Sequence, residues 1–407
     1  MVSRVIMWKP KNFLQALFPI YILNFLFCHG AVEFLGVDKP KTKYLFLYTV
    51  ITLVIHLSSY AYVLFNYFDP HWASGYLISY FINTNITFFV MIINIAAGWA
   101  FKTKSAMINT RLIKADVMLD TLGVPVNFKK EFFFSIKIAV FWIVYLLFIN
   151  ISMVSIYQNY NLLLRTFLAI VIQHAYYVNL IIDLSFYQFI NHMKVRFKNI
   201  NKVLIDILQL QSNNSTHKEE TDYKWAISRK INFEKDFMEI IRKIKNIHLE
   251  LGILCRELMK VYGIPIVFTM IRAFTNTTSF LFLIFIISKD QNMILSNKIL
   301  FLLNFTIWLT VFILKVIFIN YICAGTVNEW QETGATIHKL ECNSKDSNFQ
   351  REIQNFSIQM LQNPLKFSPC GFFDLGYYFL RDVSKIFHYI YLKFIYDIKV
   401  SSHLTIF

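Results

Sequence analysis

Residues 44–68 read YLFLYTVITLVIHLSSYAYVLFNYF and contain no Asp, Glu, Lys or Arg. A helix needs about 20 consecutive apolar residues to cross the hydrocarbon core of a bilayer. This segment is therefore long enough to span a membrane, and the uncharged segment 72–101 follows it closely. Four further spans are predicted where a long apolar run contains a single charged residue: 132–157, 166–190, 261–287 and 299–323.

The composition of the whole chain agrees with these spans. Of 407 residues, 56% are hydrophobic, 17% are aromatic and only 16% are charged. A soluble chain of this length needs far more charge, because most of a folded surface faces water. The sequence therefore predicts an all-α membrane protein with several transmembrane helices. The net charge of +15 gathers in particular loops, so it does not indicate a nucleic-acid partner.

The distribution of Lys and Arg predicts which loops face the cytosol. Segments 102–131, 191–260 and 326–370 carry 6, 14 and 4 of these residues. The short loops on the opposite side, 69–75, 158–165 and 288–298, carry 0, 1 and 2. Cytosolic loops are enriched in positive charge, which places the first set inside. Contact between a basic loop and anionic membrane lipid is a second reading of the same charge.

The uncharged run 12–32 decides the side of the N-terminus. If it crosses the membrane, the N-terminus is outside and the topology is that of a G-protein-coupled receptor. Pro19 lies near its middle, and the span 72–101 lacks the acidic-Arg-aromatic triplet expected at its end in that class. We therefore expect 12–32 not to cross. The N-terminus is then cytosolic, and a seventh crossing near the C-terminus makes that end extracellular.

The sequence contains no motif that indicates an enzyme, and neither a Walker loop nor the GxGxxG, HExxH or GxSxG motif occurs. His338 and Cys342 share a helical spacing, but two ligands without further partners do not make a metal site. Neither a metal nor a cofactor is predicted.

The predicted cytosolic loop 191–260 carries two amphipathic stretches. The first apolar stripe runs from Phe189 through Phe197 to Ile207, and the second runs from Phe233 to Leu254. A polar run over 211–217 separates them and reads as a flexible link. Each stripe must be buried. Burial within one chain and burial against another subunit are both open from the pattern.

The C-terminal third resembles the insect gustatory receptors. The resemblance lies in Phe356-Ser-Ile-Gln359, in Pro364, and in the turn Gly371-Phe372-Phe373-Asp374-Leu375. Upstream, His248, Leu251 and Cys255 lead to Val261-Tyr-Gly-Ile-Pro265, which looks like the family's entry into its fifth helix. Residues 189–201 look like the exit from its fourth, and 18–30 resemble its cytosolic N-terminal segment.

This resemblance implies a seven-helix receptor that forms a tetrameric, cation-permeable channel, gated directly by small-molecule tastants in the plasma membrane of sensory neurons. The tetramer is a homomer or a heteromer with related receptors, and its last helix lines the pore. The implied divisions are 1–43 (cytosolic N-terminal segment), 44–190 (helices 1–4), 191–260 (cytosolic helical loop), 261–325 (helices 5–6), 326–370 (anchor helix) and 371–407 (an atypical last helix and tail). The alternatives are a non-conducting subunit and a membrane transporter.

In such receptors the ligand pocket lies among helices 2 to 6, in the extracellular half. Aromatic walls with a few amide and hydroxyl groups suit a small neutral ligand. The alternative for each residue is that it ties helices together within the membrane. The candidate residues are Tyr76, Tyr80, Asn83, Gln173, His174, Tyr177, Thr275, Asn276, Ser279, Asn304 and Trp308.

Of the four charged residues inside the predicted spans, Lys137 lies near the cytosolic end of its helix and can reach water. The other three need partners or water. Asp183 and Lys315 lie at similar depth and are candidates for an ion pair. Arg272 lies near mid-membrane with no obvious partner, which makes it a further candidate for the pocket or a water-filled cavity. A structural role is the expected one for each.

The tail departs from the family. Gustatory receptors end in Thr-Tyr, five apolar residues and Gln-Phe, whereas at 388–396 only Tyr389 matches this motif. The segment also contains Arg381, Asp382, Lys385, Lys393 and Asp397, each costly at the centre of a membrane helix. One hypothesis is an atypical pore helix. The other is that residues 383–407 are read through from an unspliced intron, because the splice-donor sequence GTAAGT read in frame encodes Val383-Ser384.

Overall fold

The computed structural model describes residues 10–27, 41–67, 74–156, 161–214, 233–289, 295–343 and 347–389. Within these ranges the chain is helical and contains no strand. The helices are α1 (Phe13–Ala16), α2 (Phe18–Leu26), α3 (Lys41–Tyr67), α4 (Ser74–Ala100), α5 (Lys102–Thr121), α6 (Phe128–Ile156), α7 (Leu162–Asn214), α8 (Phe233–Lys289), α9 (Leu295–Asn343), α10 (Ser347–Gln362) and the 3-10 turn η1 (Pro369–Gly371). Residues 377–389 form a final helix.

Six helices of the described chain, α3, α4 and α6 to α9, are long and apolar enough to cross a membrane. They coincide with the six spans predicted from the sequence. The prediction of a multi-pass, all-α membrane protein is therefore confirmed. Residues 390–407, which would complete a seventh crossing, lie outside the described residues.

The N-terminal run 12–32 does not form one spanning helix over its described part. It contains the four-residue helix α1 and the nine-residue helix α2, with Pro19 in the first turn of α2. At 1.5 Å per residue α2 is about 13 Å long, less than half of a bilayer core. The two helices pack against α5, α6 and α7.

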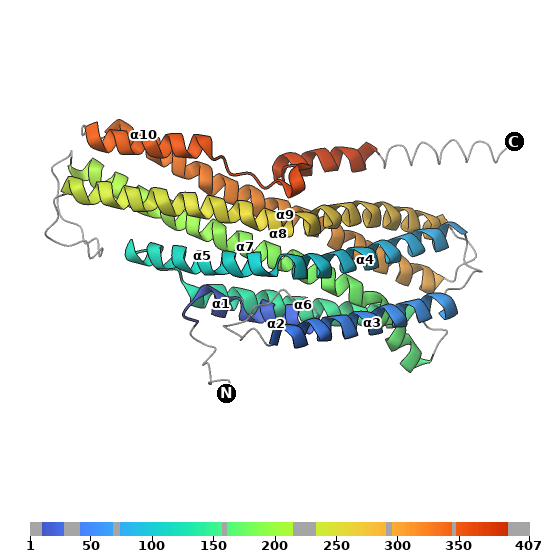
Figure 1. The fold of residues 1–407 in the computed structure, drawn as a ribbon. Coiled ribbons are helices and arrows are strands. Elements are labelled where there is room, and N and C mark those ends of the chain that lie inside the picture. The colour runs from blue at the N-terminus through green and yellow to red at the C-terminus, as the bar shows by residue number, and fades with distance from the viewer. Residues whose placement is uncertain are drawn as a thin grey trace.

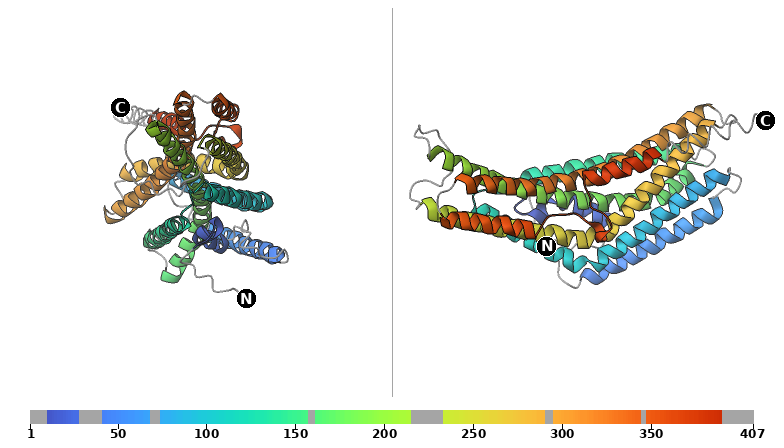
Figure 2. Two further views of the ribbon diagram at one scale, coloured as in Figure 1. Left: turned by 90° about the vertical axis from the view of Figure 1, so that its left-hand side faces the viewer. Right: turned by 90° about the horizontal axis from the view of Figure 1, so that it is seen from above.

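Helices α7, α8 and α9 run the whole length of the molecule (Figure 1). They contain 53, 57 and 49 residues, so each is about 75–85 Å long. A bilayer core is about 30 Å thick, and the remaining length extends beyond it. This extension forms a bundle that includes α5 and α10 at one end of the elongated fold (Figure 2).

The predicted loop 102–131 is mostly helical, since α4 breaks at Phe101 and the chain continues directly into α5. Sequence reasoning treated this segment only as a basic loop. Its inner face is apolar, with Ile108, Leu112 and Leu119 buried against the extended helices. Lys104 and Arg111 of α5 pair with Glu257 and Glu250 of α8. These charges lower the mean hydropathy of the segment, which explains why a hydropathy scan does not detect this helix.

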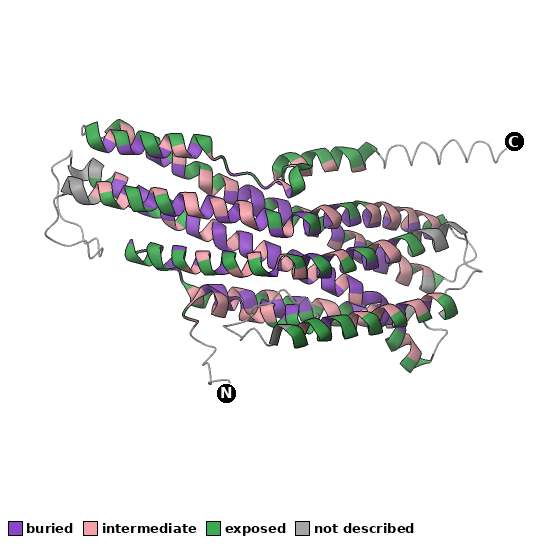
Figure 3. Cartoon of the chain, in the orientation of Figure 1, coloured by how far each residue is buried: buried purple, intermediate pink, exposed green. Residues whose placement is uncertain are grey.

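Both amphipathic stripes of 191–260 are buried within one chain. Phe197 and Ile200 of α7 and Ile244, Leu251 and Leu254 of α8 belong to one large hydrophobic cluster. This cluster also includes residues of α5, α9 and α10, and it forms a continuous buried band through the bundle (Figure 3). Packing within the chain therefore accounts for both stripes. Of the predicted link, residues 211–214 end α7, and 215–232 lie outside the described residues.

Candidate functional site

A small cavity lies between the membrane portions of five helices. Its volume is about 30 Å³, and helices α4, α6, α7, α8 and α9 each contribute to its wall. Four residues predicted for the pocket line it, one each from α4 and α7 and two from α9. These are Asn83, Gln173, Asn304 and Trp308.

Aromatic rings form one wall of this cavity. The ring of Trp308 lies 4.9 Å from that of Tyr176, measured between centroids, and stacks on Phe280 at 6.4 Å. Phe280 in turn lies 5.7 Å from Phe305. All four residues line the cavity. Tyr176 was not predicted from the sequence, although it is one helical turn from Gln173 and therefore shares its face.

The polar groups of the cavity are incompletely paired. Among the described residues, the side-chain oxygens of Asn83, Gln173 and Asn304 are buried and accept no hydrogen bond. The amide nitrogen of Asn304 donates to the hydroxyl of Ser152. An unpaired buried polar group costs roughly 1–3 kcal/mol in proteins, and no lipid group can satisfy it. The cavity therefore offers several acceptors to a molecule that carries hydroxyl or N–H donors.

Other predicted pocket residues lie elsewhere. His174 and Tyr177 lie on another side of α7, where both rings contact Phe27, 5.8 Å and 6.2 Å away between centroids. Thr275 lines a different groove, between α8, α9 and the final helix, and donates to the carbonyl of Ile271. The sequence expectation that these three share one pocket with Gln173 is therefore not met. The physical reason is the rotation of α7 and α8 about their axes, which the apolar pattern alone does not fix.

The remaining pocket candidates have no described place at the cavity. Asn276 is fully buried, and both polar atoms of its amide lack a partner among the described residues. Ser279 is partly buried in α8 and does not line the cavity. The structure does not describe the side chains of Tyr76 and Tyr80.

A buried charged triad lies beside the aromatic wall. Asp183 of α7 contacts the ammonium of Lys315 of α9 and accepts a hydrogen bond of 2.9 Å from Thr269. Arg272 of α8 lies 3.6 Å from the same carboxylate. The expectation that Arg272 has no partner is therefore wrong, because it also faces Asp183.

The triad adjoins the cavity through Phe312. Arg272 lies over the ring of Phe312 at 5.8 Å, and that ring lies 6.2 Å from Tyr176 and 6.0 Å from Trp308. Phe312 therefore contacts both the cavity wall and the charges that join α7, α8 and α9.

The predicted anchor motif lies at the end of the bundle and precedes the final helix. It consists of Gln359, Pro364, Gly371, Phe372 and Phe373. Gln359 donates to the backbone carbonyl of Lys245 at 3.1 Å. After Pro364, the turn uses Gly371 with φ +77°, a conformation that favours glycine. Phe373 then stacks on Phe379 at 4.7 Å, whereas Phe372 is exposed. The chain turns back along the membrane portion where the backbone N–H of Gly376 donates to Asn320 at 2.9 Å.

Sequence reasoning missed a second buried charged cluster, in the bundle. Arg196 of α7 makes two hydrogen bonds to Asp116 of α5 and lies 3.4 Å from Glu131 of α6. His192 lies 2.9 Å from the same Glu131. The ring of Phe13 covers His192 at 4.9 Å and Arg196 at 5.4 Å. The available signal was an arginine and a histidine within an otherwise apolar stripe.

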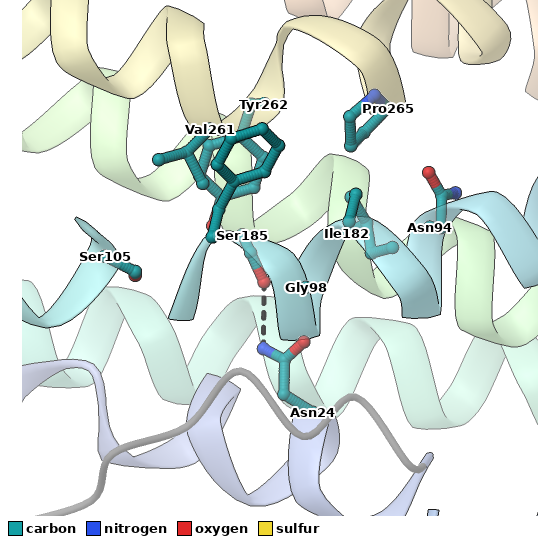
Figure 4. A pocket seen from close by; sticks show the side chains of 11 residues that line it. Asn24, Asn94, Gly98, Ser105, Ile182, Ser185, Val261, Tyr262 and Pro265 are labelled. Atoms are coloured by element: carbon teal, nitrogen blue, oxygen red, sulfur yellow. Dashed lines mark hydrogen bonds between the residues drawn. The ribbon is translucent and has the colours of Figure 1, made fainter. Parts of the chain in front are cut away.

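A second cavity, of about 50 Å³, lies where α4 breaks into α5 (Figure 4). Asn24 of α2 donates to Ser185 of α7 at 2.9 Å on its edge, and Pro265 interrupts the backbone hydrogen bonds of α8 beside it. A space of this size holds a few water molecules. We assign it no ligand.

Comparison with known proteins agrees with this architecture. The profile of a family described as 7tm Chemosensory receptor matches residues 18–380. The solved structure of the insect olfactory receptor OR5 from Machilis hrabei superimposes with a TM-score of 0.55 at 11% identity, covering 92% of this chain and 96% of that one. The same receptor in complex with eugenol gives a TM-score of 0.52 at 12% identity, covering 91% and 94%. No curated protein sequence matches the chain.

The family match extends over most of the chain, from the first turn of α2 into the final helix. The structural likeness shows that the fold is similar to that of the insect olfactory receptor OR5. An enzymatic function is not indicated, and the chain belongs to the 7tm chemosensory receptor family.

Proposed function

We propose that this chain is a gustatory receptor subunit, which opens an ion channel in the plasma membrane of sensory neurons when a small-molecule tastant binds. The observation that carries the proposal is the cavity between α4, α6, α7, α8 and α9, with aromatic walls and unpaired amide oxygens. The similar fold of an olfactory receptor solved with eugenol supports a small-molecule ligand. The resemblance of the C-terminal third supports the gustatory class.

The cavity suits a small neutral ligand with donor groups. Its polar atoms without partners are oxygens of Asn83, Gln173 and Asn304, and its wall is otherwise aromatic and aliphatic. At about 30 Å³ it holds one or two water molecules, whereas ligand pockets measure roughly 300–1,000 Å³. Ligand binding must therefore separate α8 or α9 from α7.

The charged triad supports a route from binding to gating. Asp183, Arg272 and Lys315 join the three helices that a ligand must separate, and the triad contacts the cavity wall through Phe312. Strain at Trp308 or Tyr176 then acts on the triad. The backbone N–H of Gly376, which directly precedes the final helix, donates to Asn320 of α9. Movement of α9 therefore repositions the final helix.

A homotetramer or a heterotetramer with related receptors is the assembly that the resemblance supports, with cations as the permeant ions. A second candidate function is a non-conducting subunit. The observation that favours it is the charged final helix, where Arg381, Asp382 and Lys385 are all exposed. A transporter is the alternative from another class.

Electrical recording tests the proposal. The chain is expressed alone and with a related receptor, and currents are recorded against panels of sugars and bitter compounds. Currents that require a ligand and disappear in a Trp308→Ala variant are expected, with Phe318→Ala, an exposed residue of α9, as the matched control. Saturable uptake of a compound without any ligand-dependent conductance would reject the channel in favour of the transporter.

A further inference from the structure

Polar side chains line the contact between the membrane portions of α4 and α7. Asn83, Thr87 and Asn94 of α4 follow one another at spacings of four and seven residues, so they lie on one face of that helix. Tyr176 and Asn179 of α7 bond to this face. We call these five residues the polar seam. All of them except Tyr176 are 3% exposed or less, so lipid does not reach them.

Asn179 is the centre of the polar seam. Its amide oxygen accepts a hydrogen bond of 2.7 Å from the amide nitrogen of Asn94, and its amide nitrogen donates to the backbone carbonyl of Thr87 at 3.0 Å. These two α4 residues are about 10 Å apart along the helix, at 1.5 Å per residue. One side chain therefore holds two separate turns of α4, which opposes both sliding and rotation of α4 against α7.

One end of the polar seam is the cavity between α4, α6, α7, α8 and α9. The hydroxyl of Thr87 donates to the backbone carbonyl of Asn83 at 2.8 Å, and a side-chain hydrogen bond joins Thr87 to Tyr176. Asn83 and Tyr176 both line the cavity. Asn179 does not line it, yet it bonds the carbonyl of the same threonine. Asn179 therefore acts on the cavity through Thr87 and α4.

The other end of the polar seam is the second cavity, at the break between α4 and α5 (Figure 4). Asn94 lines this cavity, and its amide oxygen is buried without a hydrogen-bond partner among the described residues. A polar cavity of this size retains water, which pairs such an oxygen. The seam thus attaches α4 to α7 from the ligand cavity nearly to Phe101, where α4 ends.

Stability alone does not account for the polar seam. Hydrogen bonds between membrane helices contribute little net stability, because separated helices find other partners. Fixing the cavity side chains before a ligand arrives has a larger effect, since each side chain that must be ordered on binding lowers the affinity. The seam orders Asn83 and Tyr176, and Asn83 carries one of the unpaired oxygens of the cavity. The main effect of the seam is therefore on the geometry of the cavity.

We propose that Asn179 is a positioning residue of the ligand cavity, which holds α4 on α7 and so keeps Asn83 and Tyr176 in the geometry that the ligand meets. This inference rests on the proposed function, because it takes that cavity as the ligand site. It makes α4 and α7 the fixed wall of the cavity. The helices that separate when a ligand enters are then α8 and α9, which carry none of the seam residues.

Dose–response recordings of an Asn179 variant test the positioning role. The probe is the sugar or bitter compound that gives the largest wild-type current. Asn179→Leu keeps a similar side-chain size and removes both hydrogen bonds to α4. We expect the half-maximal concentration of the probe to rise about 10-fold, because the cavity side chains must then be ordered on binding. Maximal current and surface expression should stay close to those of the wild type.

Asn201→Leu is the matched control. Asn201 is also a buried amide of α7, and it donates to the backbone carbonyl of Glu329 in α9 at 2.8 Å. It does not line the cavity, so its loss should leave the half-maximal concentration unchanged. Equal shifts in the two variants, or no shift in Asn179→Leu, would overturn the positioning role.

A double variant tests the same role if Asn179→Leu does not reach the cell surface. In Asn94→Leu/Asn179→Leu both partners of the hydrogen bond are apolar, so neither amide is left unpaired. The bond to Thr87 is still lost, and we expect the same rise in the half-maximal concentration. A wild-type dose–response curve in this double variant would reject the positioning role.

A second pair of substitutions tests whether Asn179 acts through Thr87. Tyr176→Phe removes the hydrogen bond between Tyr176 and Thr87. If both residues act through Thr87, the shift in Tyr176→Phe/Asn179→Leu should be smaller than the product of the two single shifts. A shift equal to the full product would show that the two residues act independently, against the proposal.

The positioning role and the proposed function fail separately. A response that Trp308→Ala abolishes and Asn179→Leu leaves unchanged keeps the ligand cavity and rejects the positioning role. A response that Trp308→Ala leaves unchanged rejects the cavity as the ligand site, and the positioning role falls with it.

Discussion

The guanidinium of Arg196 in α7 makes two parallel hydrogen bonds to the carboxylate of Asp116 in α5, 2.6 Å and 2.8 Å long, at a fully buried position. The two residues are 80 positions apart in the chain. Glu131, His192 and Phe13 close the site on its other sides. Together with Glu131 and Phe13, this pair joins α5, α6 and α7 to the N-terminal segment, outside the predicted membrane spans.

Removing one partner of this pair should destabilise the bundle. Asp116→Asn removes the carboxylate that makes two hydrogen bonds to Arg196 and leaves only Glu131, 3.4 Å away, to balance its charge. Breaking a buried pair outright costs about 3–5 kcal/mol, which is the upper limit here. We expect a clear fall in the melting temperature of the detergent-solubilised receptor. Arg111→Gln is the control, because its pair with Glu250 is partly exposed and is worth about 1 kcal/mol or less. Equal effects of the two substitutions would contradict a special role for the buried pair.

Ligand sensitivity should depend on the unpaired amides of the cavity. In Gln173→Leu the side chain keeps a similar size but loses the oxygen that would accept a hydrogen bond from the ligand. The loss of one such bond corresponds to about a 10- to 100-fold increase in the half-maximal ligand concentration. Tyr177→Phe, on another face of α7, should leave the dose–response curve in place. If the dose–response curve shifts with Tyr177→Phe and not with Gln173→Leu, the ligand binds on the face of α7 that contacts Phe27 instead.

The membrane triad should be more sensitive to single than to matched substitutions. Asp183→Asn leaves Arg272 and Lys315 as two buried cations without a counter-charge, so we expect loss of surface expression. Asp183→Asn combined with Lys315→Met removes one charge of each sign and should recover part of that expression. Surface biotinylation of the single and double variants measures both. Additive losses in the double variant would show that the two residues are not coupled.

The stability of the bundle should fall as the surrounding pH becomes acidic. His248 is buried among the rings of Phe197, Trp330 and Phe356, and this burial lowers its pKa from 6.5 to about 3. Because the unfolded state binds a proton below about pH 6.5 and the folded state does not, this stability is present above that pH and is lost below it. We expect about 1.4 kcal/mol less stability at pH 5.5 than at neutral pH.

Thermal unfolding at pH 7.5 and 5.5 measures this dependence, with His248→Gln as the matched variant. The variant removes the titrating group, so its difference between the two pH values should be smaller by that amount. A wild-type chain that is more stable at pH 5.5 would reverse the predicted sign.

The origin of the tail can be tested on the transcript. Read-through from an intron at 383 would have no reason to continue a helical pattern, yet Tyr378, Lys385 and Tyr389 lie at helical spacing on one exposed face of the final helix, on both sides of position 383. We therefore expect mature message from sensory tissue to encode residues 383–407. Sequencing of the 3′ end decides this, and a splice junction at 383 would show that Lys385 is absent from the spliced product.

The sequence by itself determined the membrane class and the six spans, and it indicated that the described part of the N-terminal run, 12–27, forms no spanning helix. The physical reason is that a bilayer imposes a length of about 20 apolar residues on every crossing helix, and segments such as 44–68 satisfy it without reference to the rest of the chain. The motif around Gly371 is likewise local, because its positive φ is a property of one short turn, whereas the contact of Gln359 with Lys245 joins residues 114 positions apart.

Only the tertiary structure decided which residues meet. Gln173 and Tyr176 face the cavity while His174 and Tyr177 face Phe27, because packing against α4, α8 and α9 fixes the rotation of α7. An almost wholly apolar span has no polar face that reveals this rotation. The carboxylate partners of Arg272 and Arg196 lie on other helices, 65 or more residues away. A buried charge shows in the sequence that a partner is required, but only helix packing selects that partner.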